Sequence, residues 1–169
     1  DHYVQHQVVS AGIQALGMDE SKIHVIIIQF VRLIRGGEIA KMSTRAGDIE
    51  TLDDLIDETS PDAVRYVLLA RSPDSRLDFD LDAAIAQNNE NPVYYIQNAH
   101  VRCAGIFRQT TDARVTDDNA DLSLLGDDEL RFIRKALELA DIIEFSAKNL
   151  EPHRIAFYAH ELATVFHPI

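Results

Sequence analysis

Two apolar stripes with helical spacing fill the C-terminal part of the chain. The first runs from Leu130 to Leu150 with an apolar residue at every third or fourth position, and the second runs from Ile155 to Phe166. Pro152 separates them, because proline fits the first turn of a helix but not its interior. Each stripe requires an apolar neighbour, so the pattern predicts helices packed in a bundle.

A run of four β-branched residues, Val25–Ile28, dominates the N-terminal part. Such a run is typical of a strand buried on both faces of a parallel sheet. A helical stripe over residues 3–16, with Gly17 as its C-terminal stop, precedes the run. A helix followed by a buried strand is half of a doubly wound α/β unit.

Gly36 and Gly37 separate two strand-like segments, 31–35 and 38–42. Adjacent glycines accept the positive φ angles of a tight turn, so these segments predict a β-hairpin. Farther along the chain, capping residues and prolines predict helices over 51–57, over 61–70 and from Pro92 onward.

The polar stretch 110–126 predicts a linker before the two C-terminal stripes. The sequence as a whole predicts a mainly α fold. In it, the remnant of a doubly wound α/β domain (helix, buried strand and hairpin) is followed by a helical bundle.

The formal net charge of the 169-residue chain is −12, which argues against a basic, nonspecific nucleic-acid binder. The single cysteine, Cys103, lies in a helical apolar stripe, where a buried inert thiol is expected, and it cannot form an internal disulfide. No apolar run approaches the roughly 18–20 residues of a membrane-spanning helix. We therefore expect a soluble cytoplasmic protein without a membrane partner.

Acidic residues alternate with apolar ones at Asp78, Asp80 and Asp82, as at the start of a calcium-binding loop. Ala83 stands where that loop needs glycine, and Asn89 stands where it needs a bidentate glutamate. The pattern instead predicts an extended segment with one apolar and one acidic face.

Two histidines, His2 and His6, are spaced to lie on one helix face, but Tyr3 stands where a zinc-protease motif has glutamate. Zinc normally takes at least three protein ligands, so these are expected to be surface histidines. We predict no protein-bound metal and no prosthetic group.

The segment Lys41–Arg45 (Lys-Met-Ser-Thr-Arg) carries two cations and two hydroxyls directly after the predicted hairpin. Mobile cations and hydroxyls suit the charge that develops on transferring phosphates. From these residues alone, a solvated basic loop is the more frequent explanation.

The same segment resembles the KMSKS-type loop of class I aminoacyl-tRNA synthetases, and its surroundings resemble arginyl-tRNA synthetase in particular. The resemblance extends over nearly the whole chain and is most specific in 71–80 and 91–100. Residues 25–33 and 51–55 are also similar to that family. Asp1-His2 resembles a stretch at the end of a catalytic strand, and residues 152–166 resemble an early helix of the anticodon-binding domain.

The resemblance implies a ligase that activates arginine with ATP, carrying Mg²⁺ as its counter-ion, and passes it from arginyl-adenylate to tRNA(Arg). Lys41 would hold the departing β,γ-phosphates, and Ser43 would orient them. The Met42 side chain would pack at the hinge of the loop. Thr44 replaces a second lysine that is frequent in the family, and Arg45 could supply part of that charge.

The resemblance also implies that Gln29, Phe30 and Val31 receive the adenine of ATP at the end of the buried strand, where ligands bind in parallel sheets. Together with Lys41–Thr44 they would form the ATP site. Asp1 and His2 would lie near the adenylate or the arginine.

By the same resemblance, residues 1–58 would be the C-terminal part of a Rossmann-like catalytic domain with the KMSKS-type loop. Residues 59–110 would form a helical connecting domain, and residues 111–169 a linker and the first helices of the anticodon-binding domain.

The sequence contains no HIGH-type motif, whose histidines belong to the adenylation machinery of this family. We therefore expect an inactive fragment from the middle of the enzyme. The full enzyme is expected to be a monomer, whereas the fragment would self-associate through its uncovered apolar stripes. The alternative is a noncatalytic helical module, derived from a synthetase, that binds tRNA or protein.

Overall fold

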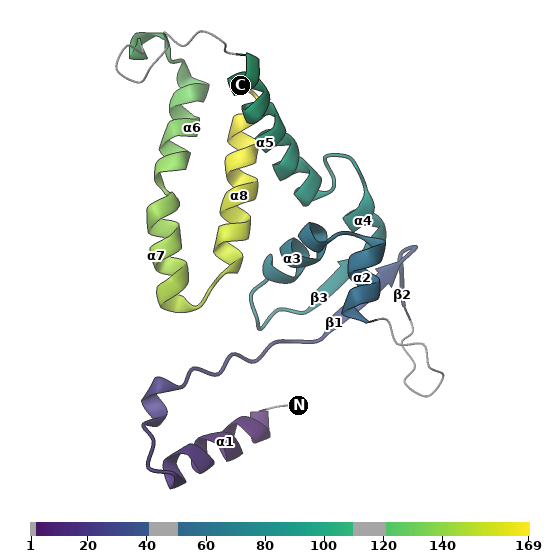
Figure 1. Ribbon diagram of the computed structural model, residues 1–169, viewed down its shortest axis with the longest axis vertical. Coiled ribbons are helices and arrows are strands. Elements are labelled where there is room, and N and C mark those ends of the chain that lie inside the picture. Colours follow the sequence, from purple (N-terminus) through teal and green to yellow (C-terminus); the bar gives the residue numbers. More distant parts are fainter. Residues whose placement is uncertain (1–2, 41–50, 110–120) are drawn as a thin grey trace.

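The computed structural model describes residues 3–40, 51–109 and 121–169 (Figure 1). An N-terminal helix is joined by an extended segment to a small sheet with three short helices, and a layer of longer helices follows (Figure 1). The helices are α1 (Tyr3–Ala15), α2 (Leu52–Glu58), α3 (Pro61–Leu69), α4 (Leu81–Ile85), α5 (Pro92–Gln109), α6 (Asp127–Leu137), α7 (Leu139–Asn149) and α8 (His153–Phe166). The strands are β1 (Val31–Arg35), β2 (Glu38–Ile39) and β3 (Leu77–Asp80), and η1 (Glu20–Lys22) and η3 (Leu122–Leu124) are 3-10 helices.

The predicted fold class, mainly α with a small α/β remnant, is confirmed. The predicted helix starts are also confirmed, and the side chains that cause them are visible. Thr51 and Asp54 form a reciprocal capping box at the start of α2. The Ser60 side chain accepts a hydrogen bond from the Ala63 N–H, and Pro61 occupies the first turn of α3.

The sheet has the strand order β2-β1-β3. Strands β1 and β2 are antiparallel and form the predicted hairpin, with Gly36 at φ 58° and Gly37 at φ 78°. Strand β3 runs parallel to β1 and places Phe79 opposite Leu33. The apolar residues of β3 are buried and its acidic ones exposed, as predicted for this alternating segment, which ends where α4 begins.

The predicted buried strand at Val25–Ile28 is wrong. Residues 23–30 have no regular secondary structure, and the exposed fraction is 48% for Val25 and 74% for Ile28. Among the described residues, no strand pairs with this run. The first strand begins at Val31 instead, where β3 supplies a parallel partner.

The main core lies between the sheet and helices α2, α3 and α4. At its centre is Phe79, with no exposed surface, and Leu33, Leu55, Val64 and Leu81 are buried around it. Burying these side chains supplies the main driving force for this part of the fold.

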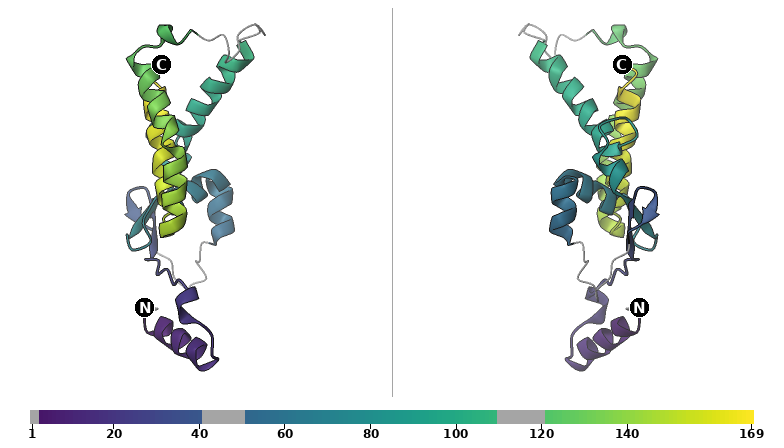
Figure 2. Two further views of the ribbon diagram at one scale, coloured as in Figure 1. Left: turned by 90° about the vertical axis from the view of Figure 1, so that its left-hand side faces the viewer. Right: turned by 90° about the vertical axis from the view of Figure 1, so that its right-hand side faces the viewer.

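Helix α8 lies between α5 on one side and α6 and α7 on the other (Figure 1). Seen from the sides, α6 and α7 overlie α8, whereas α5 crosses α8 at an angle (Figure 2). A second core cluster lies here, formed by Ala99, Ala163 and Phe166. Cys103 is only partly buried beside this cluster, not fully buried as predicted.

Two details of the predicted bundle differ from the structure. The expected single helix through Leu150 is divided at Glu138 into α6 and α7. The buried face of α8 is also rotated, because Tyr158 and Ala163 are buried while Ile155 is exposed. Periodicity alone did not show which neighbours α8 would have. Within the described ranges, no helix is long and apolar enough to cross a membrane.

Candidate adenylation segment and helical interface

Most of the predicted site residues lie outside the described residues. These are Asp1 and His2 at the start of the chain and Lys41, Met42, Ser43, Thr44 and Arg45 after the hairpin. The described part of the predicted site consists of Gln29, Phe30 and Val31. Within the described ranges, no group of three or more histidine, cysteine or acidic residues is arranged to hold a metal ion.

The structure places Gln29–Val31 at the entrance to β1, not at the end of a preceding strand. The backbone N–H of Gln29 donates to the carbonyl oxygen of Pro73 at 3.0 Å, so this amide already has a partner. The Phe30 side chain is 81% exposed. The predicted adenine contacts therefore stay a prediction, and a contact by the Gln29 N–H would require that bond to open.

A pocket of about 300 Å³ lies beside this entrance and is lined by Gln29 and Val31. Its walls are mainly apolar and come from four parts of the chain: the 26–31 segment, the end of α3 with the turn that follows it, the start of β3, and the corner between α7 and α8. Arg71, Ser72 and Ser75 supply polar groups to the lining. An apolar pocket with a few polar groups is the usual form of a small-molecule site.

The hairpin next to this pocket is held by three carboxylates. Asp82 accepts a hydrogen bond from the Gly36 N–H at 2.7 Å. The Arg35 guanidinium donates to both carboxylate oxygens of Glu58 at 2.7 and 2.8 Å. Arg32 forms the equivalent two-bond pair with Asp78, also at 2.7 and 2.8 Å, and this pair holds β1 beside β3.

Each acid of the 78–82 pattern thus has a partner of its own. Asp78 pairs with Arg32, Asp80 caps α4 by accepting from the Ala83 N–H at 3.0 Å, and Asp82 binds the hairpin turn. The hydrogen bond from Arg32 lowers the pKa of Asp78, and the same contact raises the pKa of Arg32. The pattern that resembles a calcium loop is explained by these three separate contacts.

The two described residues that flank the 41–50 stretch, Ala40 and Thr51, are each held by hydrogen bonds. On one side, the Ala40 N–H donates to the Leu33 carbonyl at 2.8 Å. On the other side, Thr51 donates its hydroxyl and its N–H to the Asp54 carboxylate at 2.6 and 2.9 Å, which lowers the pKa of Asp54.

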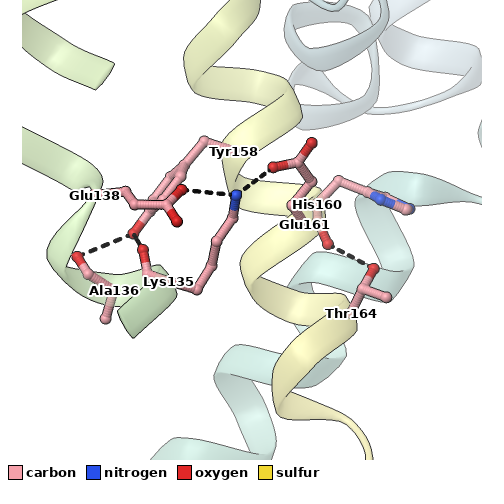
Figure 3. Close-up of polar contacts among 7 residues, drawn as sticks. All are labelled: Lys135, Ala136, Glu138, Tyr158, His160, Glu161 and Thr164. Atoms are coloured by element: carbon pink, nitrogen blue, oxygen red, sulfur yellow. Dashed lines mark hydrogen bonds and ion pairs between the residues drawn. The ribbon is translucent and has the colours of Figure 1, made fainter. Parts of the chain in front are cut away.

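The helical layer is held by a cluster around Lys135, shown in Figure 3. The Lys135 ammonium lies between two carboxylates, 2.9 Å from Glu138 and 2.5 Å from Glu161. Hydrogen bonding to Glu161 and then to Glu138 raises the pKa of Lys135. The Tyr158 hydroxyl donates to the carbonyls of Lys135 and Ala136, so α8 is tied to the end of α6.

A second polar cluster joins α5 to α8. Arg102 donates to the carbonyl oxygen of His167 at 2.9 Å, and its guanidinium lies over the Phe166 ring at 5.3 Å from the centroid. Tyr95 stacks on His160 with ring centroids 5.2 Å apart. These contacts fix the crossing of α5 and α8.

Sequence reasoning missed the roles of Glu58, Arg35 and Tyr158. Glu58 and Arg35 are 23 residues apart in the sequence, and no periodicity links them. A weak signal was present at Glu58, since an acidic residue at the C-terminal end of a helix is unfavourable without a nearby cation.

The helical part matches a known domain family. Residues 96–169 match the DALR anticodon binding domain. Over 99% of its length, the chain is also 45% identical to the arginine–tRNA ligase of Desulforudis audaxviator and 44% identical to that of Carboxydothermus hydrogenoformans. Along almost its whole length, the chain is thus similar to one segment of these two arginine–tRNA ligases.

A solved structure shows the same similarity. A crystal structure from Campylobacter jejuni, assigned as an arginyl-tRNA synthetase, superposes with a TM-score of 0.86 over 99% of this chain, at 32% identity. The resemblance stated from the sequence is therefore confirmed. The chain spans 31% of the length of each of the two ligases and 37% of the Campylobacter chain.

Proposed function

We propose that this chain is part of an arginine–tRNA ligase that forms arginyl-adenylate from arginine and ATP and transfers the arginine to tRNA(Arg). ATP would enter with Mg²⁺ as its counter-ion. The observation that carries the proposal is the extent of the similarity, which covers the α/β remnant as well as the helices. A stand-alone anticodon-binding module would need only the residues that match that domain, 96–169.

In this proposal, residues after the hairpin act on the phosphates of ATP. Lys41 holds the departing pyrophosphate, Ser43 orients it, and Arg45 adds positive charge. Such groups accelerate phosphoryl chemistry by stabilising charge that develops in the transition state. Met42 and Thr44 complete the segment.

Adenine would bind at Gln29–Val31, with the neighbouring pocket offering an apolar surface to a planar base. Asp1 and His2 would lie near the adenylate. We propose a catalytic part (1–58), a connecting part (59–110) and an anticodon-binding part (111–169). This division assigns the hairpin and the helical layer to different steps of the reaction.

Pyrophosphate exchange tests the proposal. The intact protein that contains this chain should exchange pyrophosphate into ATP when arginine is present, and it should charge tRNA(Arg). The 169-residue chain alone should do neither, because the sequence contains no HIGH-type motif. Arginine-dependent exchange by the isolated chain would contradict its expected inactivity.

The alternative is a noncatalytic module that binds tRNA or protein, and the match of residues 96–169 to an anticodon binding domain favours it. This alternative predicts that the intact protein binds tRNA but supports no arginine-dependent exchange. The same assay therefore separates the two functions.

A further inference from the structure

The β1–β2 hairpin is anchored by carboxylates from two elements that follow it in the sequence. Asp82, in the first turn of α4, accepts from the Gly36 N–H at the turn. Glu58, the last residue of α2, binds the guanidinium of Arg35, the last residue of β1. The two contacts hold the tip of the hairpin against the helices.

We propose that Glu58 and Asp82 are positioning residues for adenylate formation, because they fix the hairpin from which the chain continues to Lys41. This inference rests on the proposed function. Ala40, the last described residue before Lys41, is bonded to Leu33 of β1. A shift of β1 would therefore move Ala40, the residue from which the chain continues to the proposed phosphate-binding segment.

The hairpin needs such anchors because it is small. Strand β2 has two residues, and its register rests on the pairs Ile34–Ile39 and Arg35–Glu38. A short two-stranded hairpin is marginally stable by itself. Hydrogen bonds that involve a charged group are stronger than neutral ones, so the two carboxylates add well-directed restraint.

The Arg35–Glu58 pair also joins the strand before the 41–50 stretch to the helix after it. Helix α2 follows Thr51 directly, and its Leu55 is buried in the same core as Leu33. The Glu58 carboxylate lies at the negative end of this helix, where no basic residue of α2 itself offsets it. Arg35 supplies the missing cation from the neighbouring strand.

Because this pair is exposed, its effect on positioning can be distinguished from an effect on the stability of the fold. The side chains of Arg35 and Glu58 are 48% and 39% exposed, and ion pairs of that kind contribute little to folding. Loss of the pair should therefore leave the unfolding temperature almost unchanged. Misplacement of a catalytic group by about 1 Å can nevertheless lower a rate by up to about a hundredfold.

The experiment uses the intact protein and single-turnover adenylate formation. Glu58→Ala and Asp82→Ala should each lower the adenylation rate constant on the order of tenfold, with unchanged affinity for arginine. Asp82→Asn should keep most of the rate, because an amide oxygen can still accept from the Gly36 N–H. The reversed pair Arg35→Glu/Glu58→Arg should recover most of the loss caused by Glu58→Ala.

Asp57→Asn is the matched control, since Asp57 is exposed, adjacent to Glu58 and without a polar partner among the described residues. It should leave the rate unchanged. Hydrogen exchange over residues 36–40 gives a second readout and should become faster in Asp82→Ala.

The possible outcomes separate the positioning role from the proposed function and from a merely structural role. Rates equal to that of the unmodified protein in Glu58→Ala and Asp82→Ala, or unchanged hydrogen exchange in Asp82→Ala, would overturn the positioning role and leave the proposed function standing. Failure of the unmodified intact protein to form adenylate would overturn both. A parallel fall in rate and unfolding temperature would show a merely structural role and overturn the positioning role.

Discussion

The hydroxyl of Tyr158 in α8 donates to the backbone carbonyl of Lys135, 3.0 Å away, two residues before α6 ends. The neighbouring carbonyl of Ala136 lies 3.2 Å from the same oxygen. Carbonyls in the last turn of a helix lack regular intrahelical partners. Besides the Glu138 N–H, which lies 3.2 Å from the Lys135 carbonyl, Tyr158 supplies a donor from another helix, so the end of α6 is stabilised by a tertiary contact.

Replacing this hydroxyl should weaken the helical layer. Tyr158→Phe removes the donor without changing the ring, and we expect the free energy of unfolding to fall by about 1–2 kcal/mol. Denaturant titration measures the change. Tyr94→Phe is the control, because Tyr94 is exposed and has no hydroxyl partner among the described residues. Equal losses in the two variants would contradict a specific role for Tyr158.

Replacing the buried side-chain amide of Asn91 should also lower the free energy of unfolding. Asn91 donates to the carbonyls of Ala84 and Ala86 at 2.9 and 2.8 Å and accepts from the Val93 N–H at 3.0 Å. Asn91→Asp replaces both donors with carboxylate lone pairs facing two carbonyls, so we expect a loss of about 3 kcal/mol at neutral pH.

That loss should shrink in acid, since a protonated carboxyl can donate again. Asn89→Asp makes the same charge change at an exposed residue without a polar partner among the described ones, so it should cost almost nothing. Denaturant titrations at two pH values compare the variants. A cost for Asn91→Asp that is independent of pH would count against the donor explanation.

Acid should weaken the contact between β1 and β3. The hydrogen bond from Arg32 lowers the folded-state pKa of Asp78. A lowered folded pKa contributes stability that is present above the unfolded pKa of about 4 and is lost as the pH falls through the folded value. Asp78→Asn should therefore give a shallower decline of unfolding free energy below about pH 4. An unchanged acid slope would show that the pair is not coupled to folding.

Lys41→Ala in the intact protein tests the proposed phosphate contact. Loss of one group that acts mainly in the transition state should lower the rate of adenylate formation by about 10²–10³-fold, with little change in arginine binding. Single-turnover measurement with titrated arginine separates the two quantities. An unchanged rate would indicate that Arg45 or another cation performs this role.

The 169-residue chain should self-associate in solution. Phe30, Phe107 and Leu124 are among its exposed large apolar side chains, with exposed fractions of 80–81%. Large apolar patches are rarely left bare on monomers, and the repulsion from a net charge of −12 is screened beyond about 8 Å at physiological salt. Sedimentation over a range of concentrations should show dimers or larger species, whereas a strict monomer at tens of micromolar would refute the expectation.

The sequence by itself determined the features that depend on neighbouring residues. Thr51 and Ser60 begin helices because their side chains bond to backbone groups within three residues. Gly36 and Gly37 make the hairpin because both accept positive φ. The alternation in 77–80 likewise fixed which side chains of β3 are buried. The resemblance to arginyl-tRNA synthetases could also be recognised from the sequence, because the matching segments extend along nearly the whole chain.

Only the tertiary structure decided the features that depend on distant partners. Val25–Ile28 has the composition of a buried strand but lacks a pairing strand among the described residues, whereas Val31–Arg35 pairs with β3. The last turn of α6 is bonded by Tyr158 from α8, and Asp82 acquires its role from Gly36. Strand pairing, helix packing and ion pairs join residues far apart in the chain, so local propensity and periodicity could not specify them.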